Sequence, residues 1–167
     1  MTRLLQPPLT LLDKYRGRDR QTLYSTTVTV TGGAAGHGRA SGIARSDDGN
    51  LEVDLRLPRE LGGPGGGTNP EQLFAAGYAA CFHGALSLLA AQSGVPIPDS
   101  AVSVTVAFGR DPMDGLFVLT VDTRIRLPGV ERAVAEELVR NTERFCPYTK
   151  MARQGITNIV ALDASSE

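Results

Sequence analysis

Residues 73–91 contain no acidic or basic side chain, and this segment constrains the fold more than any other. Alanine and leucine dominate it, and its polar side chains are only Tyr78, His83 and Ser87. A helix that is apolar on every side is typical of burial on every side, because a solvent-facing side would carry charges. The segment therefore predicts a central buried helix with Cys81 at its middle.

The ends of this helix have their own signals. Thr68 and Glu71 have the spacing of a capping box, and Pro70 suits the first helical turn. Ser93 and Gly94, followed by the sequence VPIP, end the pattern. We expect the helix to begin near residue 69 and to end near residue 93.

The rest of the chain alternates between strand and helix patterns. The strand patterns cover residues 21–33, 51–58, 101–108, 116–127 and 156–164, and an amphipathic helix covers residues 129–145. Residues 34–50 are small, glycine-rich and polar, and they end in Asp48-Gly49, a favourable hairpin turn. The order β-β-α-β-β-α-β predicts an α+β fold with mostly antiparallel pairing.

Burial of the charge-free helix is difficult within one small α+β domain. A second copy of the chain could cover its remaining sides, and the alanine and glycine content would let two such helices approach closely. We therefore predict an obligate homodimer. The alternative is a central helix beneath a single curved sheet of the same chain.

Composition places the chain among single-domain proteins. Its 167 residues, 41% of them hydrophobic, predict one domain over residues 22–167 after an N-terminal extension, residues 1–21. A net charge of -1 without a basic stripe argues against nucleic acid and anionic membranes as partners. Neither a secretory signal nor a sufficiently long uninterrupted apolar run is recognised, so we expect a cytoplasmic protein.

The two cysteines, Cys81 and Cys146, could simply fill the core, since free cysteine is often buried. A buried thiol far from polar groups would be inert, because burial raises its pKa. Cys81 lies too far along its helix to benefit from the positive end of that helix, which acts within about one turn. A reactive Cys81 therefore needs a cation from elsewhere, and arginine stays charged when buried.

Two cysteine motifs carry a more specific signal. The sequence TNPEQLFAAGYAACFHGAL, with RFCPYT and PRELGGPGGGTNP, resembles the organic hydroperoxide resistance (Ohr) proteins of the OsmC/Ohr superfamily over about residues 22–163. The resemblance implies an intertwined homodimer with buried central helices between β-sheets. It also implies a peroxidase that reduces organic hydroperoxides to alcohols, without a bound cofactor and with an external dithiol reductant of the lipoyl type.

The resemblance also assigns roles. Cys81 matches the peroxidatic cysteine, Cys146 the resolving cysteine, and Glu71 the glutamate of the family. The family has its arginine directly after the glycine pair, where this chain has alanine in a longer loop, GGAAGHGRASG. Arg39 then takes that role, with Arg45 as the alternative. Glu71 as a plain helix cap and Arg39 as a solvated loop residue remain open.

Helix geometry adds a prediction about which subunit provides each residue. Ten residues of helix span about 15 Å, so Glu71 cannot touch Cys81 of its own helix. If the two share a site, antiparallel helices of two subunits must bring them together. The sequence therefore predicts a composite site across a dimer.

Four further residues have weaker signals. Phe82 and Tyr148, beside the cysteines, could line an apolar pocket for the alkyl group of a peroxide or could pack in the core. His37 and His83 do not make a zinc site with the cysteines, because the Cys-x-His spacing is wrong and a second ligand pair is missing. Two functional alternatives stay open: an OsmC-like peroxidase with a different peroxide preference, and a non-catalytic thiol redox sensor or ligand-binding protein.

Overall fold

The computed structural model describes residues 13–33, 36 and 39–163. Its elements are β1 (Val28–Thr31), β2 (Gly42–Ser46), β3 (Glu52–Leu55), the 3₁₀ turn η1 (Arg59–Leu61), α1 (Pro70–Gln92), β4 (Ala101–Arg110), β5 (Phe117–Arg126), α2 (Arg132–Phe145) and α3 (Pro147–Gln154). The predicted α+β class is confirmed. Much of the predicted N-terminal extension, residues 1–12, lies outside the described residues.

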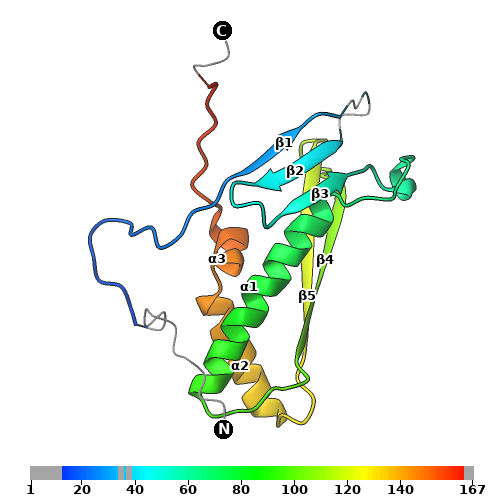
Figure 1. The fold of residues 1–167 in the computed structure, drawn as a ribbon. Coiled ribbons are helices and arrows are strands. Elements are labelled where there is room, and N and C mark those ends of the chain that lie inside the picture. The colour runs from blue at the N-terminus through cyan, green and yellow to red at the C-terminus, as the bar shows by residue number, and fades with distance from the viewer. Residues whose placement is uncertain (1–12, 34–35, 37–38, 164–167) are drawn as a thin grey trace.

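The strands form two separate antiparallel sheets (Figure 1). One has the order β1-β2-β3, and the other is the long hairpin β4-β5, in which Ala101 faces Arg126 and Arg110 faces Phe117. The hairpin predicted for this region is confirmed. A single curved sheet over the helix, the alternative to a dimer, is wrong for the described residues, because no strand joins the two sheets.

Strand β2 corrects the prediction that residues 34–50 form only a loop and a turn. Gly42–Ser46 is the central strand of the first sheet, and Ala44 is buried there at 2% exposure. Ile43 is the one large apolar side chain of the strand, which therefore lacks the alternation that marks a strand in sequence. Gly42 has φ +90°, and a Cβ there would lie 2.4 Å from the Thr31 carbonyl oxygen. Only glycine therefore fits where the β2 backbone approaches the end of β1.

Helix α1 begins and ends close to the predicted residues, but its N-terminal cap differs. The Asn69 side chain accepts a hydrogen bond from the backbone N–H of Gln72 at 2.9 Å, whereas Thr68 Oγ1 donates to the Gln72 side chain. The capping box of Thr68 and Glu71 is therefore wrong. Asparagine caps a helix as well as threonine does, and its use leaves the Glu71 carboxylate available for another partner.

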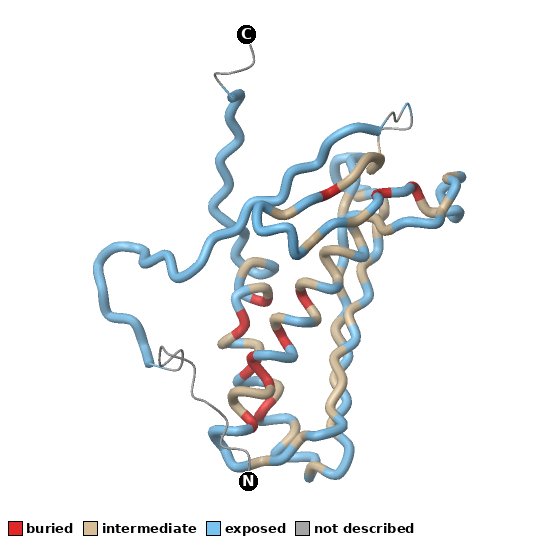
Figure 2. The backbone as a smooth tube through the Cα atoms, viewed as in Figure 1, coloured by how far each residue is buried: buried red, intermediate tan, exposed pale blue. Residues whose placement is uncertain are grey.

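The core lies between α1, the β4-β5 hairpin and the two C-terminal helices (Figure 2). One cluster contains Tyr78, Phe82, Ala85 and Cys146, and a second contains Leu86, Ala90 and Leu138. Within one chain α1 is thus buried on one side, and the predicted burial on every side, which requires a second subunit, stays a prediction. The positions of α1 that stay exposed include Gln72, Ala76, Ala80 and Gly84.

Contrary to the sequence-based expectation, α1 is long and apolar enough, by length and composition alone, to cross a membrane. The central helix of a globular domain meets the same criterion. Here α1 packs against β4, α2 and α3, and its buried side chains belong to both core clusters. This packing is that of a core helix.

Leu86→Ala should destabilise the fold strongly, because Leu86 is fully buried at the centre of the second cluster. Truncation of a buried leucine costs about 2–5 kcal/mol of unfolding free energy. Urea denaturation at a fixed protein concentration measures the loss. Leu61→Ala is the matched control, because Leu61 is 49% exposed, and we expect a change within about 0.5 kcal/mol. Equal losses in the two variants would contradict this assignment of the core.

The C-terminal part contains two corrections. Helix α3 was not predicted, and it starts because Pro147 is well suited to a first helical position. The strand predicted over residues 156–164 is not formed in 156–163, which extend away from α3 (Figure 1). A strand pattern forms a strand only beside a partner strand. The apolar side chains of this segment therefore remain exposed: Ile156, Ile159, Val160 and Leu162.

Candidate active site

Two free thiols meet at the centre of the domain. Cys81 lies in the middle of α1, and Cys146 lies at the junction of α2 and α3. Their Sγ atoms are 3.7 Å apart, although the residues are 65 positions apart in sequence. Cys146 is fully buried and Cys81 partly buried. The structure therefore brings together the two cysteines that the sequence singled out.

The sequence Cys146-Pro147 explains the position of the second thiol. A residue before proline is disfavoured in helical conformation, so α2 has to end there. Cys146 indeed has an extended backbone, with φ -70° and ψ 121°, and is both the C-cap residue of α2 and the N-cap residue of α3. This break between two helices turns the Cys146 side chain into the core against α1.

The environment of Cys81 within one chain favours the protonated thiol. Burial, and after it the neighbouring Cys146, raise the pKa of Cys81 from 9.0 to about 11. A backbone hydrogen bond from Tyr148, in the first turn of α3, has the opposite but smaller effect on this pKa. At neutral pH the thiol would thus be protonated unless a cation approached it.

A second pair lies at the N-terminal end of α1. Arg39, from the loop between β1 and β2, makes an ion pair with Glu71 through its Nη2, and both side chains are largely buried, at 24% and 17% exposure. The Arg39 guanidinium also lies over the Phe108 ring of β4, with Cζ 3.9 Å from the ring centroid. Glu71 is thus the partner of an arginine and not the cap of its helix.

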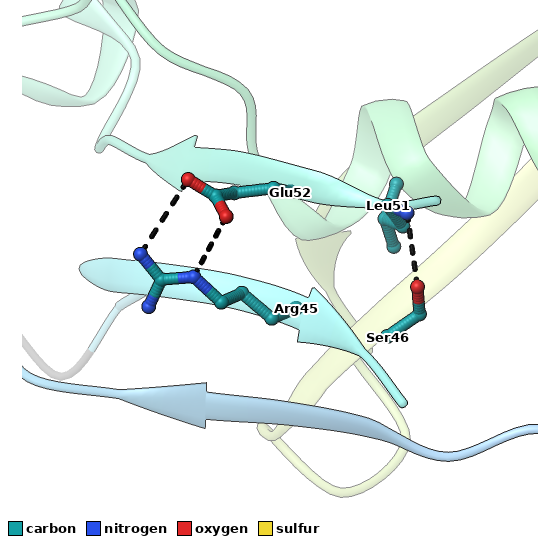
Figure 3. A network of polar contacts seen from close by, with 4 residues as sticks. All are labelled: Arg45, Ser46, Leu51 and Glu52. Atoms are coloured by element: carbon teal, nitrogen blue, oxygen red, sulfur yellow. Dashed lines mark hydrogen bonds and ion pairs between the residues drawn. The ribbon is translucent and has the colours of Figure 1, made fainter. Parts of the chain in front are cut away.

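Arg45, the alternative arginine, has a different partner. It lies on β2 and forms two hydrogen bonds to Glu52 of the neighbouring strand β3, at 2.8 and 3.5 Å (Figure 3). Both side chains are at least half exposed. In this structure Arg39, and not Arg45, contacts the glutamate of the predicted site.

The Cys81–Cys146 thiol pair and the Arg39–Glu71 ion pair lie at different positions along the axis of α1. Ten residues separate Glu71 from Cys81, which corresponds to about 15 Å of helix. Phe74, Tyr78 and Cys81 follow Glu71 by three, seven and ten residues, spacings that place all four on the same side of α1. Phe74 and Tyr78 therefore lie between the two pairs. Within one chain the two predicted halves of the site are therefore formed but not joined.

An aromatic cluster lines the interval between the two pairs. Tyr148 packs against Phe74 and Tyr78, with ring centroids 6.3 and 5.7 Å apart, and Phe74 and Tyr78 are 6.1 Å apart. Gly77 permits this approach, because a Cβ there would lie 2.9 Å from the Tyr148 hydroxyl oxygen. Tyr148 is thus near Cys81 as predicted, at the edge of an apolar cluster.

Phe82 belongs to the core, at 2% exposure among Tyr78, Ala85 and Cys146. Phe74 and Tyr78 were not predicted as site residues, although their helical spacing from Cys81 was a usable signal. Phe108 was not predicted either, because its place beside Arg39 depends on how the hairpin packs against the loop.

His83, considered as a metal ligand, has its Nε2 atom 3.1 Å from Ser100 Oγ. His37 lies outside the described residues. Over the part of the chain that the structure describes, no group of three or more His, Cys, Asp or Glu side chains is arranged to hold a metal ion.

Comparison with known proteins gives the family. The OsmC-like protein family matches residues 63–160, which include α1, both cysteines and the break before α3. The chain belongs to the OsmC family. An organic hydroperoxide resistance protein of Xanthomonas axonopodis pv. citri (strain 306) is 44% identical over 137 residues, which cover 81% of this chain and 92% of the relative. The resemblance seen in sequence is thereby confirmed.

Solved structures of OsmC-family proteins share the fold. The organic hydroperoxide resistance protein OhrB of Bacillus subtilis has 41% identity and a TM-score of 0.68, with coverage of 80% of this chain and 93% of that one. An organic hydroperoxide resistance protein from Legionella pneumophila has 39% identity and a TM-score of 0.70, covering 81% and 93%. The likeness extends over nearly the whole of each relative.

Proposed function

We propose that this OsmC-family chain is a cysteine-based peroxidase that reduces organic hydroperoxides to alcohols in peroxide stress defence in the cytoplasm. The observation that carries the proposal is the 3.7 Å separation of Cys81 Sγ and Cys146 Sγ. A partly exposed thiol has a second, buried thiol beside it, which is the arrangement that a peroxidase with an internal resolving thiol requires. The names of the relatives agree with this activity.

The chemistry has three balanced steps. The Cys81 thiolate attacks the distal oxygen of ROOH, the O–O bond breaks, and the alkoxide takes a proton and leaves as ROH, so that Cys81 becomes a sulfenic acid. The Cys146 thiol attacks this sulfur, and the disulfide forms with loss of water. An external dithiol, which we propose is of the lipoyl type, then returns both cysteines to thiols and is itself oxidised to a disulfide.

Formation of the disulfide requires only a short movement. A disulfide bond is about 2.05 Å long, so the sulfur atoms must approach by less than 2 Å from their positions in the reduced chain. Cys146 lies at the junction of two helices and belongs to neither, so a change in its backbone angles shifts one residue and not a whole helix. Rapid capture of the sulfenic acid would protect Cys81 from further oxidation.

The cation is proposed to come from a second subunit. Cys81 needs a positive charge to be a thiolate at neutral pH, and the Arg39–Glu71 pair of its own chain is about 15 Å away along α1. In a homodimer with antiparallel α1 helices, the Arg39–Glu71 pair of one subunit would lie beside Cys81 of the other. Arg39 would stabilise the thiolate and orient the peroxide, and Glu71 would fix the guanidinium.

Two surfaces support the dimer. The exposed side of α1 has small residues at four-residue intervals, Ala76, Ala80 and Gly84, which would let a second helix approach closely. The exposed C-terminal segment contains Ile156, Ile159, Val160 and Leu162, at 71–89% exposure, in a strand pattern without a neighbouring strand. Pairing of this segment with a sheet of a second subunit would bury these side chains.

The test is stoichiometric. Reduced protein is mixed with cumene hydroperoxide or with hydrogen peroxide, and thiol loss is followed over time. We expect loss of two thiols per chain, faster with the organic peroxide, and sustained turnover with dihydrolipoamide. Preference for hydrogen peroxide would favour the OsmC-like alternative. Oxidation no faster than that of free cysteine would refute the peroxidase and leave the binding or sensor alternative.

A further inference from the structure

Arg39 lies at one end of a four-membered stack of side chains. Its guanidinium covers the Phe108 ring at 3.9 Å, Phe108 stacks on Phe117 with centroids 4.8 Å apart and ring planes at 27°, and the Arg110 guanidinium covers Phe117 at 4.3 Å. Two cations thus lie against a stacked pair of aromatic rings. Only the Arg39 contact involves the predicted site.

The hairpin register explains the stack. Phe108 faces Leu119 across the two strands, and Arg110 faces Phe117, so these four side chains lie on the same face of the hairpin. Phe108 and Phe117 are therefore diagonal neighbours, a distance that aromatic side chains can bridge. Because β4 packs along α1, the same face brings Phe108 to the loop residue Arg39.

The two contacts of Arg39 restrain different properties of its guanidinium. The Glu71 carboxylate binds one nitrogen, Nη2, and so fixes the position of the charged group. The Phe108 ring covers the flat face, which sets the plane of the group. The ion pair fixes the position of one nitrogen and the ring fixes the plane of the group, so together they favour one orientation.

We propose that Phe108 is a positioning residue that holds the Arg39 guanidinium in the orientation needed beside the reactive thiol. This inference rests on the proposed function, in which Arg39 stabilises the Cys81 thiolate. The electron-rich ring face attracts the cation, so both the shape and the charge distribution of the phenylalanine matter. Leucine would fill much of the space but would not provide that face.

The experiment measures the rate of Cys81 alkylation by iodoacetamide against pH, together with kcat/KM for cumene hydroperoxide. For Phe108→Leu we expect both rates at pH 7 to fall about tenfold, with the alkylation midpoint shifted to higher pH, as loss of a partly desolvated cation–π contact would produce. Phe108→Tyr should restore both rates. Arg110→Ala is the matched control, because it removes the same kind of contact at the other end of the stack, and we expect less than a twofold change.

A series of fluorinated phenylalanines at position 108 tests the role of the ring face even if Phe108→Leu folds poorly. Phenylalanine with increasing fluorine substitution at position 108 keeps the shape of the ring but weakens its negative face. We expect the alkylation rate at pH 7 to fall with each added fluorine. A rate independent of fluorination would overturn the role of Phe108.

The outcome for Arg39→Ala separates the two proposals. If Arg39→Ala is impaired while Phe108→Leu keeps the pH dependence and kcat/KM of the unmodified protein, the positioning role is wrong and the proposed function stands. If Arg39→Ala itself has unchanged rates, the assignment of Arg39 in the proposed function is wrong, and the role of Phe108 is overturned with it.

Discussion

Replacement of Cys81 by serine should abolish hydroperoxide reduction with dihydrolipoamide. The serine hydroxyl is a far weaker nucleophile than a thiolate and cannot form the sulfenic acid or the disulfide. We expect turnover to fall to the uncatalysed background, measured as alcohol formed from cumene hydroperoxide. The neighbouring thiol, Cys146, cannot take over, because it is fully buried.

Cys146→Ser provides the comparison for this result. Cys81 should still react once with the hydroperoxide, and the sulfenic acid should then accumulate because the second thiol is missing. Labelling with dimedone detects it, and prolonged exposure should convert it to the irreversible sulfinic acid. Turnover by the Cys81→Ser variant, or immediate disulfide formation in Cys146→Ser, would contradict the assigned roles.

The second large effect concerns Arg39→Ala. Loss of a group that stabilises charge at a reaction centre costs on the order of a hundredfold or more in rate. Without the cation, the pKa of Cys81 should approach the value of about 11 that burial and the neighbouring Cys146 set within the chain. Because a raised pKa reduces the thiolate fraction, only about one thiol in ten thousand would be ionised at pH 7. The alkylation rate should then rise about tenfold per pH unit up to that pKa.

Arg45→Ala is the control for this variant. Arg45 is also an arginine near the first sheet, but it pairs with the exposed Glu52. We expect its alkylation profile to match that of the unmodified protein. A loss of rate in Arg45→Ala and none in Arg39→Ala would show that the alternative assignment of the arginine was right.

Mixed dimers test whether the site is composite. Cys81→Ser and Arg39→Ala homodimers should each be inactive, but exchange of their subunits creates dimers in which one site has both residues. Half of the dimers in an equal mixture are mixed, and each has one complete site, so about a quarter of full activity should return. If Arg39 serves the cysteine of its own chain, mixing would restore no activity.

The sequence predicted well those features that depend on local chemistry. The charge-free stretch and its flanking proline and glycine predicted α1 close to its observed bounds. The alternating residues predicted the β4-β5 hairpin, and the resemblance singled out Cys81 and Cys146 as a pair. Each of these has a strong pattern in consecutive residues or a motif of unusual composition.

Features that depend on neighbouring segments were missed. Apart from Ile43, strand β2 consists of small and polar residues, and it is a strand because β1 and β3 flank it. Residues 156–163 have a strand pattern but lie beside no strand of the described residues, so they form none. The partner of Glu71 also depended on the tertiary fold, since the cap was provided by Asn69 and the carboxylate was left for Arg39.

The unequal exposure of the two thiols has a consequence for the order of bond changes during reduction. Cys146 is fully buried, whereas Cys81 is partly exposed. In the proposed cycle, an incoming dithiol therefore attacks the Cys81–Cys146 bond at Cys81 Sγ, and Cys146 becomes the leaving group. The mixed disulfide of the proposed cycle then joins the reductant to Cys81, so the peroxide and the electron donor approach the same thiol.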